Sequence, residues 1–220
     1  MSFTIEDRQY MARAIQLAAK GIYTTDPNPR VGCVLVRDGV IIGEGYHQRA
    51  GEGHAEVNAL KVAGDATGAT AYVTLEPCSH YGRTPPCSQG LIDAGIARVV
   101  AAMVDPNPEV AGKGIAMLQA AGIDATAGIL ESEARALNLG FLSRMERGRP
   151  FVRLKLATSI DGRTAMASGE SQWITGPEAR ADVQRLRARS SAVITGVGSV
   201  LQDDSALTVR EEQLPASVLP

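Results

Sequence analysis

Apolar positions follow two alternating patterns along most of the chain up to residue 145. Short apolar runs bounded by turn residues predict strands, whereas apolar residues that recur every three or four positions predict amphipathic helices. The helical pattern covers residues 6–20, 54–64, 87–92, 114–121 and 131–145. The strand pattern covers residues 31–36, 40–45, 71–75, 98–103 and 123–127. This alternation predicts a three-layer α/β domain with helices on both faces of one sheet.

A charged segment at residues 146–150 separates this pattern from a second one. Beyond it the sequence predicts strands at 151–156 and 192–195 and a helix at 177–189 that begins with proline. We therefore predict two domains, residues 1–146 and residues 147–220. Because about 70 residues are few for the α/β fold that they begin, we expect the second domain to be incomplete.

The composition is that of a globular protein with an ordinary charged surface. Hydrophobic residues make up 45% of the chain, and its net charge is −2. This mild acidity, without a basic cluster, argues against a nucleic-acid partner. No apolar run reaches membrane-spanning length, and the amino-terminal residues lack the pattern of a signal peptide. Three cysteines without a disulfide pattern favour the reducing cytoplasm.

Three residues that can bind metal, His54, Cys78 and Cys87, form a pattern typical of a catalytic zinc site. They leave the fourth position of the ion to water, as catalytic zinc sites do. Glu56 follows His54 by two residues and Pro77 precedes Cys78, as in zinc-dependent nucleobase deaminases. In that chemistry zinc makes hydroxide available near neutral pH, and the glutamate shuttles protons. The pattern therefore predicts a hydrolytic deaminase with Glu56 as its catalytic residue.

A structural zinc site, or no metal at all, is the alternative interpretation of this pattern. A structural site needs four protein ligands, and Cys33, His47 and His80 are the candidates for the fourth. Such a site would give Glu56 and Pro77 no role, so the catalytic interpretation is favoured. Cys33 lies inside a predicted strand, where we expect a small buried side chain.

Eight residues separate Cys78 from Cys87, whereas two are usual in zinc deaminases. We expect this insertion to form a polar flap over the open position of the metal. His80 and Arg83 give the flap positive character, and arginine can bind two phosphate oxygens at once. The flap therefore predicts a phosphate or another anion on the substrate, and a solvated loop is the alternative.

Two polar residues near the first two predicted strands are further candidates for substrate binding. Asn28 lies in the rigid turn at 26–29, where its amide could contact a sugar hydroxyl or a ring edge. Simple turn formation is the alternative explanation for this segment. His47 follows the second predicted strand, where a role in the pocket and a purely structural role are both open.

The motifs of the chain resemble those of the bifunctional deaminase–reductase family of riboflavin biosynthesis. The resemblance covers nearly the whole chain, and the long spacing between Cys78 and Cys87 separates this family from cytidine and tRNA-adenosine deaminases. The matching segments are residues 27–29, 31–32, 43–47, 54–56, 74–80, 84–87, 105–108, 155–157, 159–163, 171–175, 203–204 and 207–210.

This resemblance implies a fold, a substrate and a reaction. The implied fold is a cytidine-deaminase-like domain followed by the start of a dihydrofolate-reductase-like domain. The implied substrate is 2,5-diamino-6-(5-phosphoribosylamino)pyrimidin-4(3H)-one, whose 2-amino group would be replaced by oxygen. His80 and Arg83 would then meet the ribose phosphate, while Asn28 and His47 would position the sugar and the ring. The resemblance also implies a homo-oligomer.

The same resemblance implies that the second domain uses NADPH to open and reduce the ribose. The residues implied for NADPH are Ala157, Trp173, Ser199 and Asp203. The residues implied for the reductase substrate are Lys155, Ser171, Arg187, Leu207 and Arg210. Members of the family continue past this point with further strands and a glycine-rich segment. We therefore expect an active deaminase and an inactive reductase in this chain.

Two other functions remain as alternatives. A deaminase of free nucleosides, free bases or tRNA would share the zinc chemistry, but it would use a basic groove in place of the phosphate-binding flap. A non-catalytic remnant would only bind zinc or a partner. Glu56 and the complete ligand set argue against this second alternative.

Overall fold

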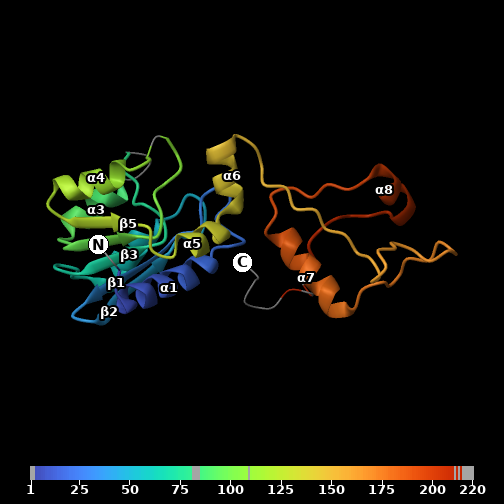
Figure 1. Ribbon diagram of the computed structural model, residues 1–220, viewed down its shortest axis with the longest axis horizontal. Helices are drawn as coiled ribbons and strands as arrows, with labels where there is room; N and C mark the ends of the chain where they lie inside the picture. The colour runs from blue at the N-terminus through green and yellow to red at the C-terminus, as the bar shows by residue number, and fades with distance from the viewer. Residues whose placement is uncertain (1–2, 81–84, 109, 211, 213, 215–220) are drawn as a thin grey trace. The chain divides into compact units, whose positions relative to one another are not determined.

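The computed structural model describes residues 3–80, 85–108, 110–210, 212 and 214. The chain divides into two compact units, Met1–Phe151 and Val152–Pro220. Figure 1 shows helices and strands in the first unit, and helices joined by extended segments in the second. The domain boundary expected between residues 146 and 147 stays a prediction.

The first unit is built on a five-stranded sheet with the strand order β2-β1-β3-β4-β5. Its strands are β1 (Gly32–Arg37), β2 (Val40–Tyr46), β3 (Thr70–Val73), β4 (Arg98–Ala101) and β5 (Asp124–Ala127). β1 is antiparallel to both β2 and β3, and β3, β4 and β5 are parallel to one another. The carboxyl ends of β2, β3 and β4 therefore lie at the same edge of the sheet.

Helices cover both faces of this sheet, so the predicted three-layer fold is confirmed (Figure 1). They are α1 (Ile5–Ala19), α2 (Ala55–Ala63), α3 (Cys87–Asp93), α4 (Lys113–Ala120), α5 (Glu131–Leu137) and α6 (Leu139–Arg147). Side chains of β1 alternate between two hydrophobic clusters. Val34 and Val36 pack in the cluster that includes α1, α5 and α6, whereas Cys33 and Leu35 pack in the cluster that includes α2, α3 and α4.

The single helix predicted over residues 131–145 is wrong, because α5 and α6 meet at a break at Asn138. The Asn138 side chain is 2% exposed. Its oxygen accepts a hydrogen bond from the backbone N–H of Arg30, and its amide donates to the Arg30 carbonyl. These bonds satisfy buried backbone groups of Arg30 and hold Asn138 away from helical geometry, at φ −119° and ψ 27°. The contact spans 108 residues of sequence, so helical periodicity does not reveal it.

The second unit contains α7 (Pro177–Ala188) and α8 (Val197–Asp203). The helix predicted at 177–189 is confirmed by α7, whereas α8 was not predicted. The strands predicted at 151–156 and 192–195 are wrong for the described residues, which form no strand in this unit. A strand needs a neighbour for its backbone hydrogen bonds, and here the side chains of Val152 and Leu154 remain 79% and 81% exposed. None of the helices in the described ranges combines the length and the hydropathy that a bilayer span requires.

An ion pair between the buried Asp7 and the partly exposed Arg98 ties α1 to the sheet of the first unit. Asp7 is 2% exposed, and its carboxylate accepts hydrogen bonds from Arg98 at 2.7 Å and from the Tyr72 hydroxyl at 2.8 Å. Thr4 caps α1 and exchanges hydrogen bonds with Asp7. The hydrogen bond from Arg98 is the main cause that lowers the pKa of Asp7 to about 2.

We predict that Asp7→Asn lowers the free energy of unfolding by roughly 2 kcal/mol near neutral pH. Because the folded-state pKa lies below the ordinary value of 3.8, the stabilisation by Asp7 is complete above that value and is lost as the pH falls toward 2. Urea unfolding of both proteins at about pH 7 and about pH 3 measures this difference, which should fall by roughly half at the lower pH. A difference that does not change with pH would contradict the assignment.

Candidate metal centre

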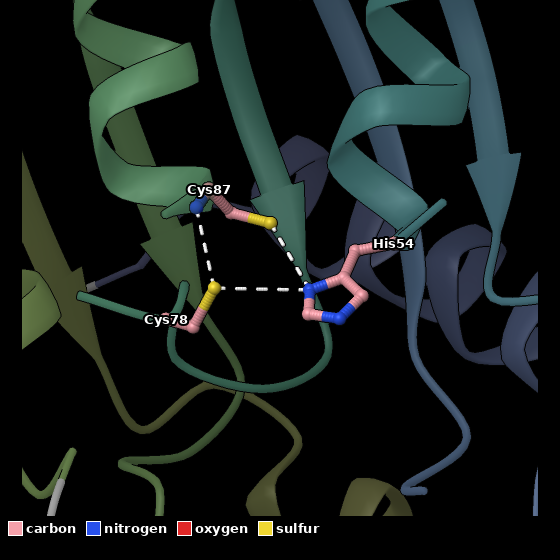
Figure 2. Close-up of side chains that lie close together, drawn as sticks. All are labelled: His54, Cys78 and Cys87. Atoms are coloured by element: carbon pink, nitrogen blue, oxygen red, sulfur yellow. Dashed lines mark hydrogen bonds between the residues drawn. The ribbon is translucent and has the colours of Figure 1, made fainter. Parts of the chain in front are cut away.

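His54, Cys78 and Cys87 converge at the edge of the sheet where β2 and β3 end (Figure 2). Their ligand atoms all lie within 4.8 Å of one another. The His54 Nδ1 atom is 3.2 Å from Cys87 Sγ and 3.7 Å from Cys78 Sγ. In a tetrahedral zinc site, Zn–S bonds of about 2.3 Å and Zn–N bonds of about 2.0 Å place nitrogen and sulfur roughly 3.5 Å apart. The three side chains therefore have the spacing of a zinc site with one position left for water.

Each of the three ligands is held by a different element. His54 is the N-cap of α2, Cys87 is the first residue of α3, and Cys78 lies in the turn after β3. The backbone N–H of Cys87 donates to Cys78 Sγ at 3.2 Å. The Ser88 hydroxyl, which the sequence analysis missed, lies 3.1 Å from the Pro77 carbonyl and 3.0 Å from the Cys78 carbonyl. The amino end of α3 therefore fixes the Cys78 turn, and its dipole favours the thiolate form.

The close approach of α2 to the sheet sets the position of His54 and Glu56. A Cβ atom at Gly45 of β2 would lie 2.4 Å from the Ala55 carbonyl oxygen and from the Ala59 nitrogen. Because this space admits no side chain, only glycine allows the helix to lie at this distance. The first turn of α2 thereby brings His54 and Glu56 to the same edge as the two cysteines.

The three ligand side chains shift one another's pKa values. The hydrogen bond with Cys87 is the main cause that lowers the pKa of Cys78 to about 4, and the same contact raises the pKa of Cys87. The hydrogen bond with Cys78 raises the pKa of His54. Metal binding displaces protons from these side chains, because cysteine ligates as the thiolate and histidine as the neutral imidazole. The donor set and its spacing therefore fit a zinc ion.

Glu56 lies beside this cluster in the first turn of α2, and its side chain is 3% exposed. Burial is the main cause that raises the pKa of Glu56, and the negative charge of Cys78 adds to it. A carboxyl group with a raised pKa can accept a proton and release it again near neutral pH. This is the place and the chemistry that a proton shuttle requires.

His47 is held between two partners at the edge of the site. Its side chain is 2% exposed, with Nδ1 at 3.1 Å from the Gly53 carbonyl oxygen and Nε2 at 3.1 Å from the Asn28 side-chain nitrogen. A carbonyl oxygen only accepts, so Nδ1 carries the proton and Nε2 accepts from Asn28. Burial also lowers the pKa of His47, which agrees with this neutral form. His47 therefore orients Asn28 and the backbone directly before His54.

The predicted phosphate-binding residues are only partly described. His80 is exposed, and Arg83 lies outside the described residues. Asp105, which is 8% exposed, interacts electrostatically with Cys78 and His80, and burial raises its pKa. It was missed as a site residue, although the motif at 105–108 contributed to the family resemblance. Cys33 is fully buried in β1, as expected.

Several residues predicted for the reductase lie next to α7 in the second unit. The Arg187 guanidinium donates to the Thr208 carbonyl at 2.9 Å, and the backbone N–H of Arg210 donates to the Gln184 side chain at 3.0 Å. These bonds join α7 to the segment that contains Leu207. Trp173 also lies next to α7, where the Arg180 guanidinium is 4.4 Å from the centre of its ring. Ser199 and Asp203 lie on α8, and Lys155, Ala157 and Ser171 lie in segments without helix or strand.

Both parts of the chain match known protein families. Residues 4–103 match the family described as the cytidine and deoxycytidylate deaminase zinc-binding region, and residues 150–218 match the RibD C-terminal domain. The riboflavin biosynthesis protein RibD of Escherichia coli K12 is 65% identical over 211 residues, or 96% of this chain. Both parts of the chain are therefore similar to RibD proteins. The resemblance inferred from its motifs is thereby confirmed.

Solved RibD structures agree with this assignment. RibD of Acinetobacter baumannii (form 1) is 60% identical, with a TM-score of 0.89 over 93% of this chain. The deaminase/reductase of Thermotoga maritima is 44% identical, also with a TM-score of 0.89 over 93% of this chain. The chain spans 58% of the length of the Escherichia coli and Acinetobacter proteins and 59% of the Thermotoga protein.

We predict that Cys87→Ser and His54→Ala each weaken zinc binding more than about 100-fold, because each removes a direct ligand. Cys33→Ala provides the matched control, since Cys33 is buried in β1 and contributes no ligand atom to the cluster. Metal analysis of the purified proteins, with chelator competition for the affinities, measures the effect. Equal loss of zinc from Cys33→Ala and Cys87→Ser would contradict the assignment.

Proposed function

We propose that the first unit is a zinc-dependent hydrolytic deaminase of riboflavin biosynthesis, with its domain at residues 1–146. Its substrate is 2,5-diamino-6-(5-phosphoribosylamino)pyrimidin-4(3H)-one, and its product is 5-amino-6-(5-phosphoribosylamino)uracil. The observation that carries this proposal is the buried Glu56 next to a cluster of three zinc ligands, in a chain similar to RibD proteins. The related Thermotoga maritima protein is named as a diaminohydroxyphosphoribosylaminopyrimidine deaminase and 5-amino-6-(5-phosphoribosylamino)uracil reductase.

The reaction replaces the 2-amino group with oxygen, consumes one water and releases ammonia. His54, Cys78 and Cys87 would hold the zinc ion, which in such a site supplies a Lewis acid that lowers the pKa of water. The Glu56 carboxylate accepts a proton as the new C–O bond forms, and it returns a proton to the amine as the C–N bond breaks. Burial raises the pKa of Glu56, which favours its uptake of this proton.

Substrate recognition is assigned to four residues around this centre. The His47 ring accepts one hydrogen of the Asn28 amide, so the Asn28 oxygen has a fixed direction for the sugar or the ring. His47 thus acts on the substrate through Asn28. We assign the ribose phosphate to His80 and Arg83, on the basis of their charge and of the ability of arginine to bind phosphate oxygens in pairs.

For the second unit we propose the role implied by the RibD C-terminal domain, in a domain that begins at residue 147. NADPH would bind near Ala157, Trp173, Ser199 and Asp203, and the ribose to be reduced near Lys155, Ser171, Arg187, Leu207 and Arg210. The absence of reductase activity in this chain stays a prediction, which NADPH oxidation with the deaminated product tests. We also propose a homo-oligomer located in the cytoplasm.

We predict that Glu56→Gln lowers kcat for ammonia release by about 10²–10⁴, since the amide cannot take up the proton. The zinc content should not change, because Glu56 is not one of the three ligands. Glu52→Gln is the matched control, because Glu52 is an exposed glutamate in the loop before His54. An ammonia-release assay together with metal analysis makes the comparison, and full activity of Glu56→Gln would show that its role is misassigned.

We predict that the phosphorylated diaminopyrimidine is deaminated faster than cytidine, guanine or tRNA by the zinc-loaded chain. Removing the phosphate from the substrate should raise KM, because the charged groups of the flap then lose their partner. Higher kcat/KM on cytidine, guanine or tRNA would support the alternative deaminases. Zinc binding without turnover of any of these compounds would support the non-catalytic alternative.

A further inference from the structure

The Glu76 side chain lies where the segment after β4 meets the turn after β3. It is 3% exposed, and both of its oxygens accept hydrogen bonds from backbone N–H groups. Oε2 accepts from Asp105 at 3.0 Å and from Gly112 at 2.9 Å. Oε1 accepts from Gly114 at 2.8 Å and from Ile115 at 3.1 Å. A carboxylate only accepts hydrogen bonds, so these four donors match its capacity.

All four donors belong to the stretch that runs from the loop after β4 into the first turn of α4. We call its described residues, 105–108 and 110–115, segment 105–115. Gly114 and Ile115 lie in the first turn of α4, where free N–H groups and the helix dipole favour a negative charge. Glu76 therefore caps this helix from the turn after β3. The same segment carries Asp105, which interacts electrostatically with Cys78 and His80.

The turn after β3 is also held by close backbone contact with α4. A Cβ atom at Gly114 would lie 2.0 Å from the Pro77 carbonyl oxygen, so only glycine allows this approach. The Ser88 hydroxyl of α3 donates to the same carbonyl at 3.1 Å. The Pro77–Cys78 turn is thus held by α3 and by α4.

We propose that Glu76 is a positioning residue of the deaminase, which holds segment 105–115 as a fixed wall beside the metal centre. This rests on the deaminase function proposed above. The Cys78 sulfur has its own support, because the Cys87 N–H and the Ser88 hydroxyl bind its turn from α3. We therefore expect loss of Glu76 to displace the wall and its Asp105, while the contacts from α3 keep the Cys78 sulfur beside the other ligands.

Glu76→Gln in the 220-residue chain tests this role. The amide keeps the shape of the side chain, but it turns one acceptor into a donor that faces backbone N–H groups. We expect kcat/KM for the phosphorylated diaminopyrimidine to fall about 10- to 100-fold, as for a reacting group misplaced by a small distance. The zinc content should not change, and amide hydrogen exchange should become faster in segment 105–115. Glu76→Asp, which keeps the charge on a shorter side chain, should give a smaller effect in the same direction.

Asp7→Asn is the matched control, because it makes the same chemical change at another buried carboxylate. Asp7 lies on α1, on the opposite face of the sheet from α4, and its partners are Arg98 and Tyr72. This variant should lower the melting temperature without changing kcat/KM or the exchange of segment 105–115. A Glu76→Gln variant that behaves in the same way would overturn the proposal and leave Glu76 a purely structural role.

Two further outcomes separate this proposal from the proposed function. Loss of zinc from Glu76→Gln would overturn the positioning role, because the residue would then support the ligands themselves. If the unsubstituted chain releases no ammonia from the diaminopyrimidine, the deaminase function fails. The exchange experiment needs no turnover, and unchanged exchange of segment 105–115 in Glu76→Gln would overturn the proposal independently of that result.

Discussion

The metal centre depends on the antiparallel pairing of β1 with both of its neighbours. Because β2 and β3 both run opposite to β1, they end at the same edge of the sheet. The loop that leads to His54 and the turn that carries Cys78 therefore leave the sheet side by side. The amino ends of α2 and α3 begin at this edge and supply His54 and Cys87. If β1 were antiparallel to only one of its two neighbours, β2 and β3 would end at opposite edges, and the ligands would lie a strand length apart.

The same convergence concentrates negative charge at the edge of the sheet. The pKa of Glu56 is raised first by burial and then by Cys78, and the pKa of Asp105 is raised by burial, Glu76 and Cys78. Such an arrangement of buried acids and thiols is costly unless positive charge offsets it. Backbone N–H groups at the amino ends of α3 and α4 supply part of that charge. A divalent cation held by His54, Cys78 and Cys87 would supply the rest, and its binding would then also stabilise the folded unit.

Local patterns in the sequence were sufficient for the fold of the first unit and for the ligand set. The spacing of His54 and Glu56 lies within one helical turn, and the periodicities of the strands and helices are also local. Two of the wrong predictions concern features that depend on contacts between distant residues. Asn138 breaks a predicted helix because its side chain binds the backbone of Arg30. Residues 151–156 do not form the predicted strand, because a strand requires a neighbouring strand for its hydrogen bonds. For α8, the spacing of Val197, Val200 and Leu201 was an available helical signal.

A zinc deaminase places two structural requirements on the segment around Cys78, and different contacts meet each of them. The sulfur must keep a fixed distance from the other ligands, and α3 meets this demand through Cys87 and Ser88. The wall of the site must fit a particular substrate, and Glu76 connects that wall to the turn through backbone N–H groups alone. Every residue type except proline offers such a backbone N–H group. Side chains of segment 105–115 other than Gly114, where a Cβ atom would meet the Pro77 carbonyl, can therefore change with the substrate while the geometry of the zinc ligands is retained.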